Sequence, residues 1–179
     1  MNKIKPRTCK VCSEVFTPAR QLVPVCSPKC AIAYANKLKA NKQKKEDKIQ
    51  REKLKTHKDY LRELQMIFNI YIRERDQNKP CISCGCNLKG KFDAGHYFSV
   101  GAYANLRFNE NNVHGQCVAC NQHKHGNISE YSIRLPERIG IEKYNKLLQQ
   151  RNETNKLSIP EIKVLKIKYK ERLKILKNE

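Results

Sequence analysis

Residues 81–127 read CISCGCNLKGKFDAGHYFSVGAYANLRFNENNVHGQCVACNQHKHGN, and the rest of the chain is organised around this stretch. A Cys-x-x-Cys pair opens it and a second lies near its end, and the four cysteines are Cys81, Cys84, Cys117 and Cys120. Four thiolates at this spacing suit a tetrahedral structural zinc ion. Acid, imidazole and amide side chains, which a purely structural zinc does not need, lie between and just after the pairs. The stretch therefore predicts a zinc-stapled unit that also carries chemistry.

Two strands and a helix are expected inside this stretch. Residues 91–98 read as a strand that follows a turn at 87–90, and residues 113–116 as a short return strand that leads into the second cysteine pair. A helix from Asn121 to about Tyr131 is expected to close the metal site. Zinc would then clamp a hairpin to a helix.

This arrangement is expected to bring His96, on the first strand, opposite Asn121, with Asp93 near the same pocket. Carboxylate and amide oxygens are hard ligands that suit Mg²⁺ or Mn²⁺, and a neutral imidazole can deprotonate water. Asp93 and Asn121 are the expected ligands of a catalytic divalent ion, and His96 is the expected base in a one-metal hydrolysis of phosphodiester bonds. Asn112 is expected to bridge backbone groups across the hairpin and hold the His96 strand in place.

A second zinc site is predicted near the N-terminus, in a unit comprising residues 1–35. Its expected ligands are Cys9, Cys12, Cys26 and Cys30. Ser27 and Pro28 form an N-cap and first helical position that place the last cysteine on an opening helical turn, while Val15 and Phe16 supply an apolar plug. The pattern indicates a zinc-ribbon or treble-clef-like unit; free thiols in a disordered tail are the alternative.

The charge balance points to a polyanionic partner. The sequence has 37 Lys and Arg against 17 Asp and Glu, a formal net charge of +20, which favours binding to DNA phosphates. Residues 36–58 are predicted to form a basic helical linker, which would lie along phosphates or act as a plain spacer. The expected nucleic-acid contacts are Lys42, Lys44, Lys45, Lys48, Arg51, Lys124 and His125.

A third domain, residues 59–179, combines the central stretch with packing helices. Helical spacing predicts one helix over residues 59–76, one from about Pro136 or Ile141 to Gln150, and one that starts at a capping signature on Ser158. The last helix carries an apolar stripe that fits a core or a dimer seam. The fold class predicted is α+β, with a small zinc-stapled core, flanking helices, an N-terminal zinc unit and a long basic helix.

Cysteine usage suggests the compartment. Nine cysteines with no signal peptide and no long apolar run favour metal binding in a reducing compartment, so a cytoplasmic protein without membrane association is expected. Eight of the nine cysteines fall into pairs, and Cys86 is interpreted as a bystander. His114 is expected to be structural or to contact phosphate rather than to act as a base.

The segments DAGHY, LRFNENNVHGQC and CVACNQHKHGN resemble the motif of the HNH (ββα-metal) endonucleases, with His96, Asn112 and Asn121 at the three signature positions. With IRERD before CISCG, the Cys-rich head and the lysine-rich helix, the whole chain resembles the NinG (Rap) family of recombination proteins from lambdoid phages. The resemblance implies an endonuclease for branched DNA, such as Holliday junctions and displacement loops. It also implies a homodimer that acts in the bacterial host.

The chain departs from the HNH pattern at two positions. Gly95 precedes the predicted base, and the acid lies further back at Asp93; the two functional side chains share a face only if a β-bulge forms at Gly95. Asp93 could instead orient His96 or bond to the backbone. At the last signature position the chain has Asn121 rather than His, and His123 or His125 could contribute instead. The alternative functions are a non-catalytic zinc-containing adaptor that binds DNA or RNA, and a structural assembly protein.

Overall fold

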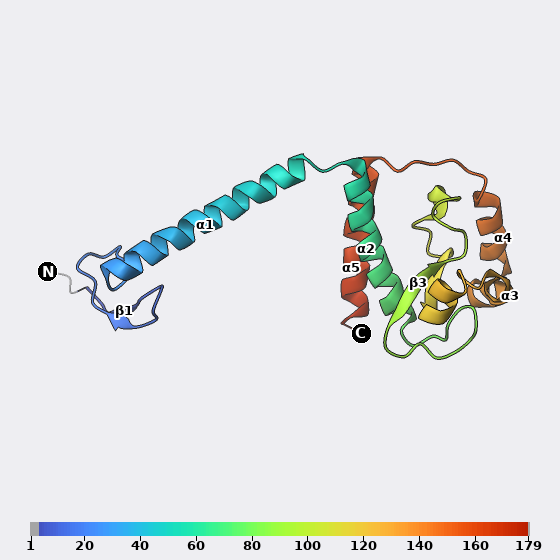
Figure 1. Ribbon diagram of the computed structural model, residues 1–179, viewed down its shortest axis with the longest axis horizontal. Coiled ribbons are helices and arrows are strands. Elements are labelled where there is room, and N and C mark those ends of the chain that lie inside the picture. Colours follow the sequence, from blue (N-terminus) through green and yellow to red (C-terminus); the bar gives the residue numbers. More distant parts are fainter. Residues whose placement is uncertain (1–3, 179) are drawn as a thin grey trace. The chain divides into compact units, whose positions relative to one another are not determined.

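The computed structural model describes residues 4–178 and divides the chain into two compact units, one ending at Lys55 and the other beginning at Thr56 (Figure 1). Both units combine helices with a two-stranded sheet, which confirms an α+β fold. None of the helices in the described part of the chain is long and apolar enough to cross a membrane.

Unit 1 consists of a small hairpin and one long helix. Strands β1 (Arg7–Thr8) and β2 (Val15–Phe16) pair antiparallel, and α1 spans Pro28–Lys53. The helix starts where the capping signal predicts, because the Ser27 hydroxyl accepts a hydrogen bond from the Cys30 amide at 3.3 Å and proline fits the first turn. The predicted boundary after residue 35 falls inside this continuous helix, and no residue of α1 is buried.

Two capped helices form the main core of unit 2. Helix α2 (His57–Asp76) and helix α5 (Ile159–Leu176) lie side by side (Figure 1), and each begins with a capping box, on Thr56 and Ser158 respectively. Their inward faces enclose a cluster of buried side chains: Tyr60, Leu64, Phe68, Tyr71, Ile72, Val113, Ile162 and Tyr169. The predicted helices that begin near residues 59 and 158 are therefore confirmed, and the apolar stripe of α5 faces this core.

The central hairpin packs on α2. Strands β3 (Phe92–His96) and β4 (Val113–Cys117) pair antiparallel in an unbroken register from Phe92 opposite Cys117 to His96 opposite Val113. The bulge that Gly95 would permit is absent. That glycine is required for another reason: a Cβ atom there would lie 2.1 Å from Gln116 Oε1 on the neighbouring strand.

The chain after β4 differs from the prediction. A single turn of π-helix, η2 (Ala119–His123), is followed by a turn, and α3 (Ile128–Ile139) begins only then, so the single helix expected from Asn121 to about Tyr131 is wrong. The interruption arises because His125, Gly126 and Asn127 all have positive φ angles, which end a right-handed helix.

Two further elements complete unit 2. Helix α4 (Ile141–Gln150) starts at the later of the two predicted positions, since Pro136 lies inside α3. A short 3₁₀ helix, η1 (Ala104–Leu106), lies in the long connection between β3 and β4. Helices α3 and α4 and this connection enclose a second cluster of buried apolar residues: Ile82, Leu106, Tyr131, Leu135 and Leu147. The hairpin thus has an apolar support on each side.

Candidate functional site

The N-terminal cysteines form one compact cluster in unit 1. The Sγ atoms of Cys9, Cys12, Cys26 and Cys30 all lie within 4.8 Å of one another. The closest contacts join Cys12 to Cys26 at 3.4 Å and Cys26 to Cys30 at 3.7 Å. Four thiols that converge from a hairpin and from the first turn of a helix could bind zinc, as predicted.

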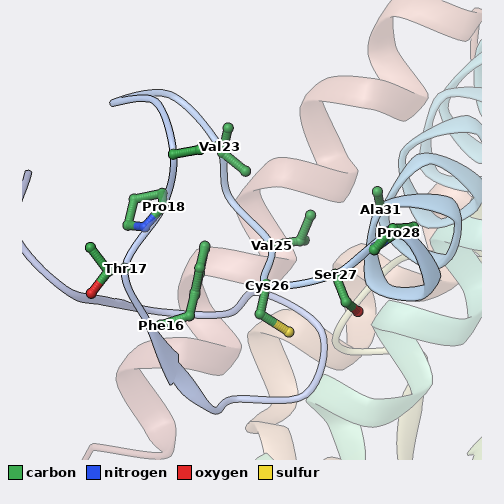
Figure 2. A pocket seen from close by; sticks show the side chains of 10 residues that line it. Phe16, Thr17, Pro18, Val23, Val25, Cys26, Ser27, Pro28 and Ala31 are labelled. Atoms are coloured by element: carbon green, nitrogen blue, oxygen red, sulfur yellow. The ribbon is translucent and has the colours of Figure 1, made fainter.

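A hollow of about 450 Å³ lies beside this cluster, between the loop after β2 and the start of α1 (Figure 2). Phe16 and Val25 line it, together with Cys26. Val25 is buried, whereas Val15 is 72% exposed, so the apolar plug of this unit is formed by Val25 and not by Val15. Because adjacent residues of a strand face opposite sides, Val15 points outward while Phe16, its neighbour on β2, lines the hollow.

The central cluster contains five cysteines. Cys81, Cys84, Cys86 and Cys117 have Sγ atoms within 4.8 Å of one another, so Cys86 belongs to the group and is no bystander. Gly85, at φ +73°, reverses the chain, and the Cys81 amide donates to the Cys86 carbonyl at 2.7 Å, which brings the Cys86 thiol back to the cluster.

Cys120 lies at the buried edge of this cluster. Its backbone N–H donates to Cys117 Sγ at 3.4 Å, and its own Sγ accepts from Asn127 Nδ2 at 3.5 Å. The Cys117 amide likewise donates to Cys81 Sγ at 3.4 Å. Such N–H donors lower the pKa of a thiol, but burial outweighs them and raises the pKa of Cys81 and of Cys120. Cys120 is not among the four cysteines whose Sγ atoms all lie within 4.8 Å of one another, but its thiol lies close to those of Cys84 and Cys117, so five thiols are candidates for the four ligands of a tetrahedral ion.

Asp93 and Asn121 meet as predicted. Asp93 Oδ2 accepts hydrogen bonds from Asn121 Nδ2 at 3.0 Å and from Gln122 Nε2 at 2.8 Å, both on η2. A carboxylate and an amide carbonyl are oxygen donors that fit Mg²⁺ or Mn²⁺. Within residues 4–178 the only groups of three or more His, Cys, Asp and Glu ligand atoms are the two cysteine clusters. Gln122 was missed by the sequence analysis, although it directly follows the predicted ligand.

His96 lies apart from this pair. In a regular strand, residues three apart face opposite sides, so Asp93 faces η2 while His96 and Ala94 face α2. His96 Nε2 forms a hydrogen bond of 3.0 Å with the backbone oxygen of Arg107. Burial lowers the pKa of His96, and the charge of Arg107 acts in the same direction, so the imidazole is neutral at pH 7.

Asn112 fastens the hairpin at its open end. Its side chain is fully buried; Oδ1 accepts from the Phe98 amide at 2.8 Å, and Nδ2 donates to the Phe98 and Leu106 carbonyls at 3.0 and 3.1 Å. This is the backbone bridge expected from the sequence. Because the amide is enclosed on all sides, it supports the His96 strand without reaching a substrate.

His114 belongs to a buried network beneath the hairpin. Its Nδ1 lies 3.0 Å from the Tyr131 hydroxyl, which donates to the Gly95 carbonyl at 3.2 Å. Burial lowers the pKa of His114 to about 3, which keeps the ring neutral and structural. Burial acts to raise the pKa of nearby Asp76, but its hydrogen bond and ion pair with Arg75 outweigh burial and lower it to about 2.

The predicted DNA contacts lie on two surfaces, one in each unit. The basic residues of α1 are all exposed, with Lys42 also in an ion pair with Glu46 at 3.9 Å: Lys42, Lys44, Lys45, Lys48 and Arg51. Lys124 and His125 are exposed in the turn after η2, in unit 2. Each surface is therefore accessible to a phosphate backbone within its own unit.

Fold and site together define an α+β protein with two cysteine clusters that could bind zinc. A family profile described as "Bacteriophage Lambda NinG protein" matches residues 1–179. The chain belongs to the NinG family of phage proteins, as the sequence resemblance predicted. The ninG proteins of Escherichia phage lambda and Salmonella phage P22 are 38% and 36% identical to it, each over 99% of this chain and 97% of the relative. No solved structure gives a significant match.

Proposed function

We propose that the protein is a metal-dependent endonuclease of the HNH type that cleaves branched recombination intermediates, such as Holliday junctions and displacement loops. It acts in phage recombination as a homodimer in the cytoplasm of the bacterial host. The observation that carries the proposal is a hairpin, fastened by the buried Asn112, that holds a neutral His96 and brings Asp93 into hydrogen-bond contact with Asn121.

Each proposed role follows from the chemistry of the side chain. Because Nε2–H of the neutral His96 ring donates to the Arg107 carbonyl, the lone pair of the imidazole is on Nδ1, and Nδ1 accepts the proton from the attacking water. Asp93 and Asn121 would hold Mg²⁺ or Mn²⁺ through their side-chain oxygens. A divalent ion there would stabilise negative charge on the phosphate. The cysteine clusters hold the hairpin and the N-terminal unit, and α1 binds DNA phosphates.

Cleavage of synthetic DNA by the zinc-loaded full-length protein tests this proposal. Four-way, flapped and linear DNA are incubated with Mg²⁺ or Mn²⁺, and His96→Ala is expected to lose at least about a hundredfold in rate, the usual worth of a general base. Asn121→Ala should also lose activity, whereas Asn145→Ala, on the exposed side of α4, is the matched amide control. An unchanged rate for His96→Ala, with normal zinc content, would exclude the catalytic role.

One observation favours the alternative of a non-catalytic zinc-containing adaptor. Asp93 and His96 lie on opposite faces of the hairpin, so the resting arrangement does not place the predicted base beside the predicted ion ligands. An adaptor would bind branched DNA or RNA in a salt-dependent manner and cleave none of the substrates. A structural assembly protein would show no salt-sensitive affinity at all.

A further inference from the structure

A groove with basic and amide residues in its lining lies in unit 2 next to Arg107. Two hollows, of about 220 and 90 Å³, share Ala104, Asn155 and Lys156 as lining residues and therefore adjoin. One wall comes from η1 and its flanks, and the other from the segment that joins α4 to α5. We call this feature the η1 groove. Each hollow is smaller than the ~300 Å³ at which sites for drug-sized ligands begin, so each admits one base or one phosphate at a time.

The groove carries an excess of positive charge. Arg107, Arg151 and Lys156 line it, against one carboxylate, Glu153. Arg151 and Lys156 are exposed, so the charge is open to a ligand from solvent. Amide side chains, which can bond to base edges, make up much of the remaining lining: Asn105, Asn152 and Asn155. Cations interleaved with amides are suited to a nucleotide, whose phosphate is anionic and whose base carries donors and acceptors.

Arg107 is held ready for an anion. Its side chain is half-buried; Nε donates to Gln65 Oε1 at 2.6 Å, and the guanidinium lies 5.2 Å from the centre of the Phe108 ring. No carboxylate of residues 4–178 forms an ion pair with it, and no hydrogen bond within that range uses its two terminal nitrogens. A fixed guanidinium with two unused nitrogens matches the bidentate geometry of phosphate oxygens.

The same residue contacts the predicted base, because the Arg107 backbone oxygen is the hydrogen-bond partner of His96 Nε2 at 3.0 Å. We propose that the η1 groove binds an unpaired segment of a DNA strand, with Arg107 holding the phosphate next to His96 and Arg151 and Lys156 holding the neighbouring one. In taking DNA as the ligand, this inference rests on the proposed function. It adds a substrate class: the strand that enters the site is single, as at a flap or a branch point.

Binding is measured separately from cleavage. The zinc-loaded full-length protein carrying His96→Ala is titrated, without Mg²⁺ or Mn²⁺, against a fluorescent oligothymidylate and a blunt duplex of equal length. Arg107→Gln is expected to weaken oligothymidylate binding about tenfold and to reduce the slope of log affinity against log salt by about 0.7, the value for one lost single-strand phosphate contact. Lys156→Gln should show the same slope change with a smaller loss. Lys170→Gln, exposed on α5 away from the groove, is the matched control and should change neither.

The outcomes separate this inference from the proposed function. If the wild type cleaves no DNA but Arg107→Gln and Lys156→Gln still weaken oligothymidylate binding selectively, the groove stands and the endonuclease proposal fails. If the wild type cleaves branched DNA while both variants bind like Lys170→Gln, the groove inference fails alone. An equal loss on the blunt duplex would overturn the assignment to a single strand. Should Arg107→Gln lose zinc or stability with the Gln65 contact, Arg151→Gln and Lys156→Gln, whose side chains are exposed, decide the question.

Discussion

The two units place cysteine clusters in very different surroundings. In unit 1, the buried residues between 4 and 55 are Cys9, Pro18 and Val25, and each strand has only two residues. Both apolar clusters of the described chain lie in unit 2, where helices α2 and α5 pack independently of the cysteines. The difference predicts that zinc, if bound by both clusters, would make the fold of unit 1, whereas in unit 2 it would close one end of a hairpin that an apolar core already supports.

Removing the metal should give the largest difference between the units. A chelator under reducing conditions is expected to unfold the β1–β2 hairpin, because structural zinc contributes roughly 10–16 kcal/mol in small zinc domains. Helices α2 and α5 should keep their protection. Hydrogen exchange followed by mass spectrometry resolves the two units in one sample. Equal loss of protection in α2 and the β1–β2 hairpin would contradict the comparison.

A core substitution should act on unit 2 alone. Phe68 is fully buried and packs edge to face against Phe108 and Tyr169. Phe68→Ala is therefore expected to lower the free energy of unfolding of unit 2 by about 3–5 kcal/mol. Near-UV circular dichroism in urea reports this unit, because every tyrosine except Tyr34 lies in it. Met66→Ala, 62% exposed on the same helix, is the control and should cost less than about 0.5 kcal/mol. Release of zinc from unit 1 by Phe68→Ala would show that the units are coupled.

Acid should weaken unit 2 through His114. The pKa of this buried ring falls from 6.5 to about 3 on folding, so protons bind the unfolded state first and stability drops as the pH falls below 6.5. Between pH 7 and pH 5 the loss is about 2 kcal/mol, and Asp76, with a pKa of about 2, adds a further loss only below about pH 4. Urea unfolding in EDTA measures this without metal release. A His114→Gln variant should lose this part of the pH dependence; an unchanged slope would assign it to another group.

Single cysteine substitutions should give the smallest effect at Cys86. Five thiols surround the central site, so Cys86→Ser is expected to leave two zinc ions per chain, with Cys120 able to complete the four ligands. Cys12→Ser removes one of only four thiols in unit 1 and should reduce the metal count to one. Metal analysis after dialysis distinguishes the two variants. Loss of zinc from Cys86→Ser would instead make Cys86 an obligatory ligand and leave Cys120 outside the site.

The elements that the sequence predicts well are those with local signals. Ser27 and Ser158 start helices where their capping patterns place them, and the four N-terminal cysteines converge as predicted, whereas in the central group Cys86 stands with Cys81, Cys84 and Cys117 in place of Cys120. The hairpin strands are also where alternation puts them. The helix caps, the strands and the individual cysteine motifs are each encoded by residues within a few positions along the chain, so the local sequence pattern is enough to predict them.

The parts that the sequence does not predict depend on backbone conformation or on distant contacts. Cys86 joins its cluster only because Gly85 reverses the chain, and the helix after β4 breaks because His125 and Asn127 adopt positive φ although neither is glycine. Separation of Asp93 from His96 follows from the regular register of the β3–β4 pair, in which Gln116 packs against Gly95. Arg107 contacts His96 through its backbone carbonyl, and since every residue has a backbone carbonyl, the sequence gives no signal for this contact.

The buried Asn112 holds both ends of the segment between Phe98 and Leu106 in place. Because its side chain is hydrogen-bonded to the backbone of both residues, insertions or substitutions in the middle of the segment need not move the ends. The middle is exposed around Gly101, where an added Cβ meets no atom within 4 Å. Changes in the length or composition of that tip are therefore expected to leave the position of His96 unchanged.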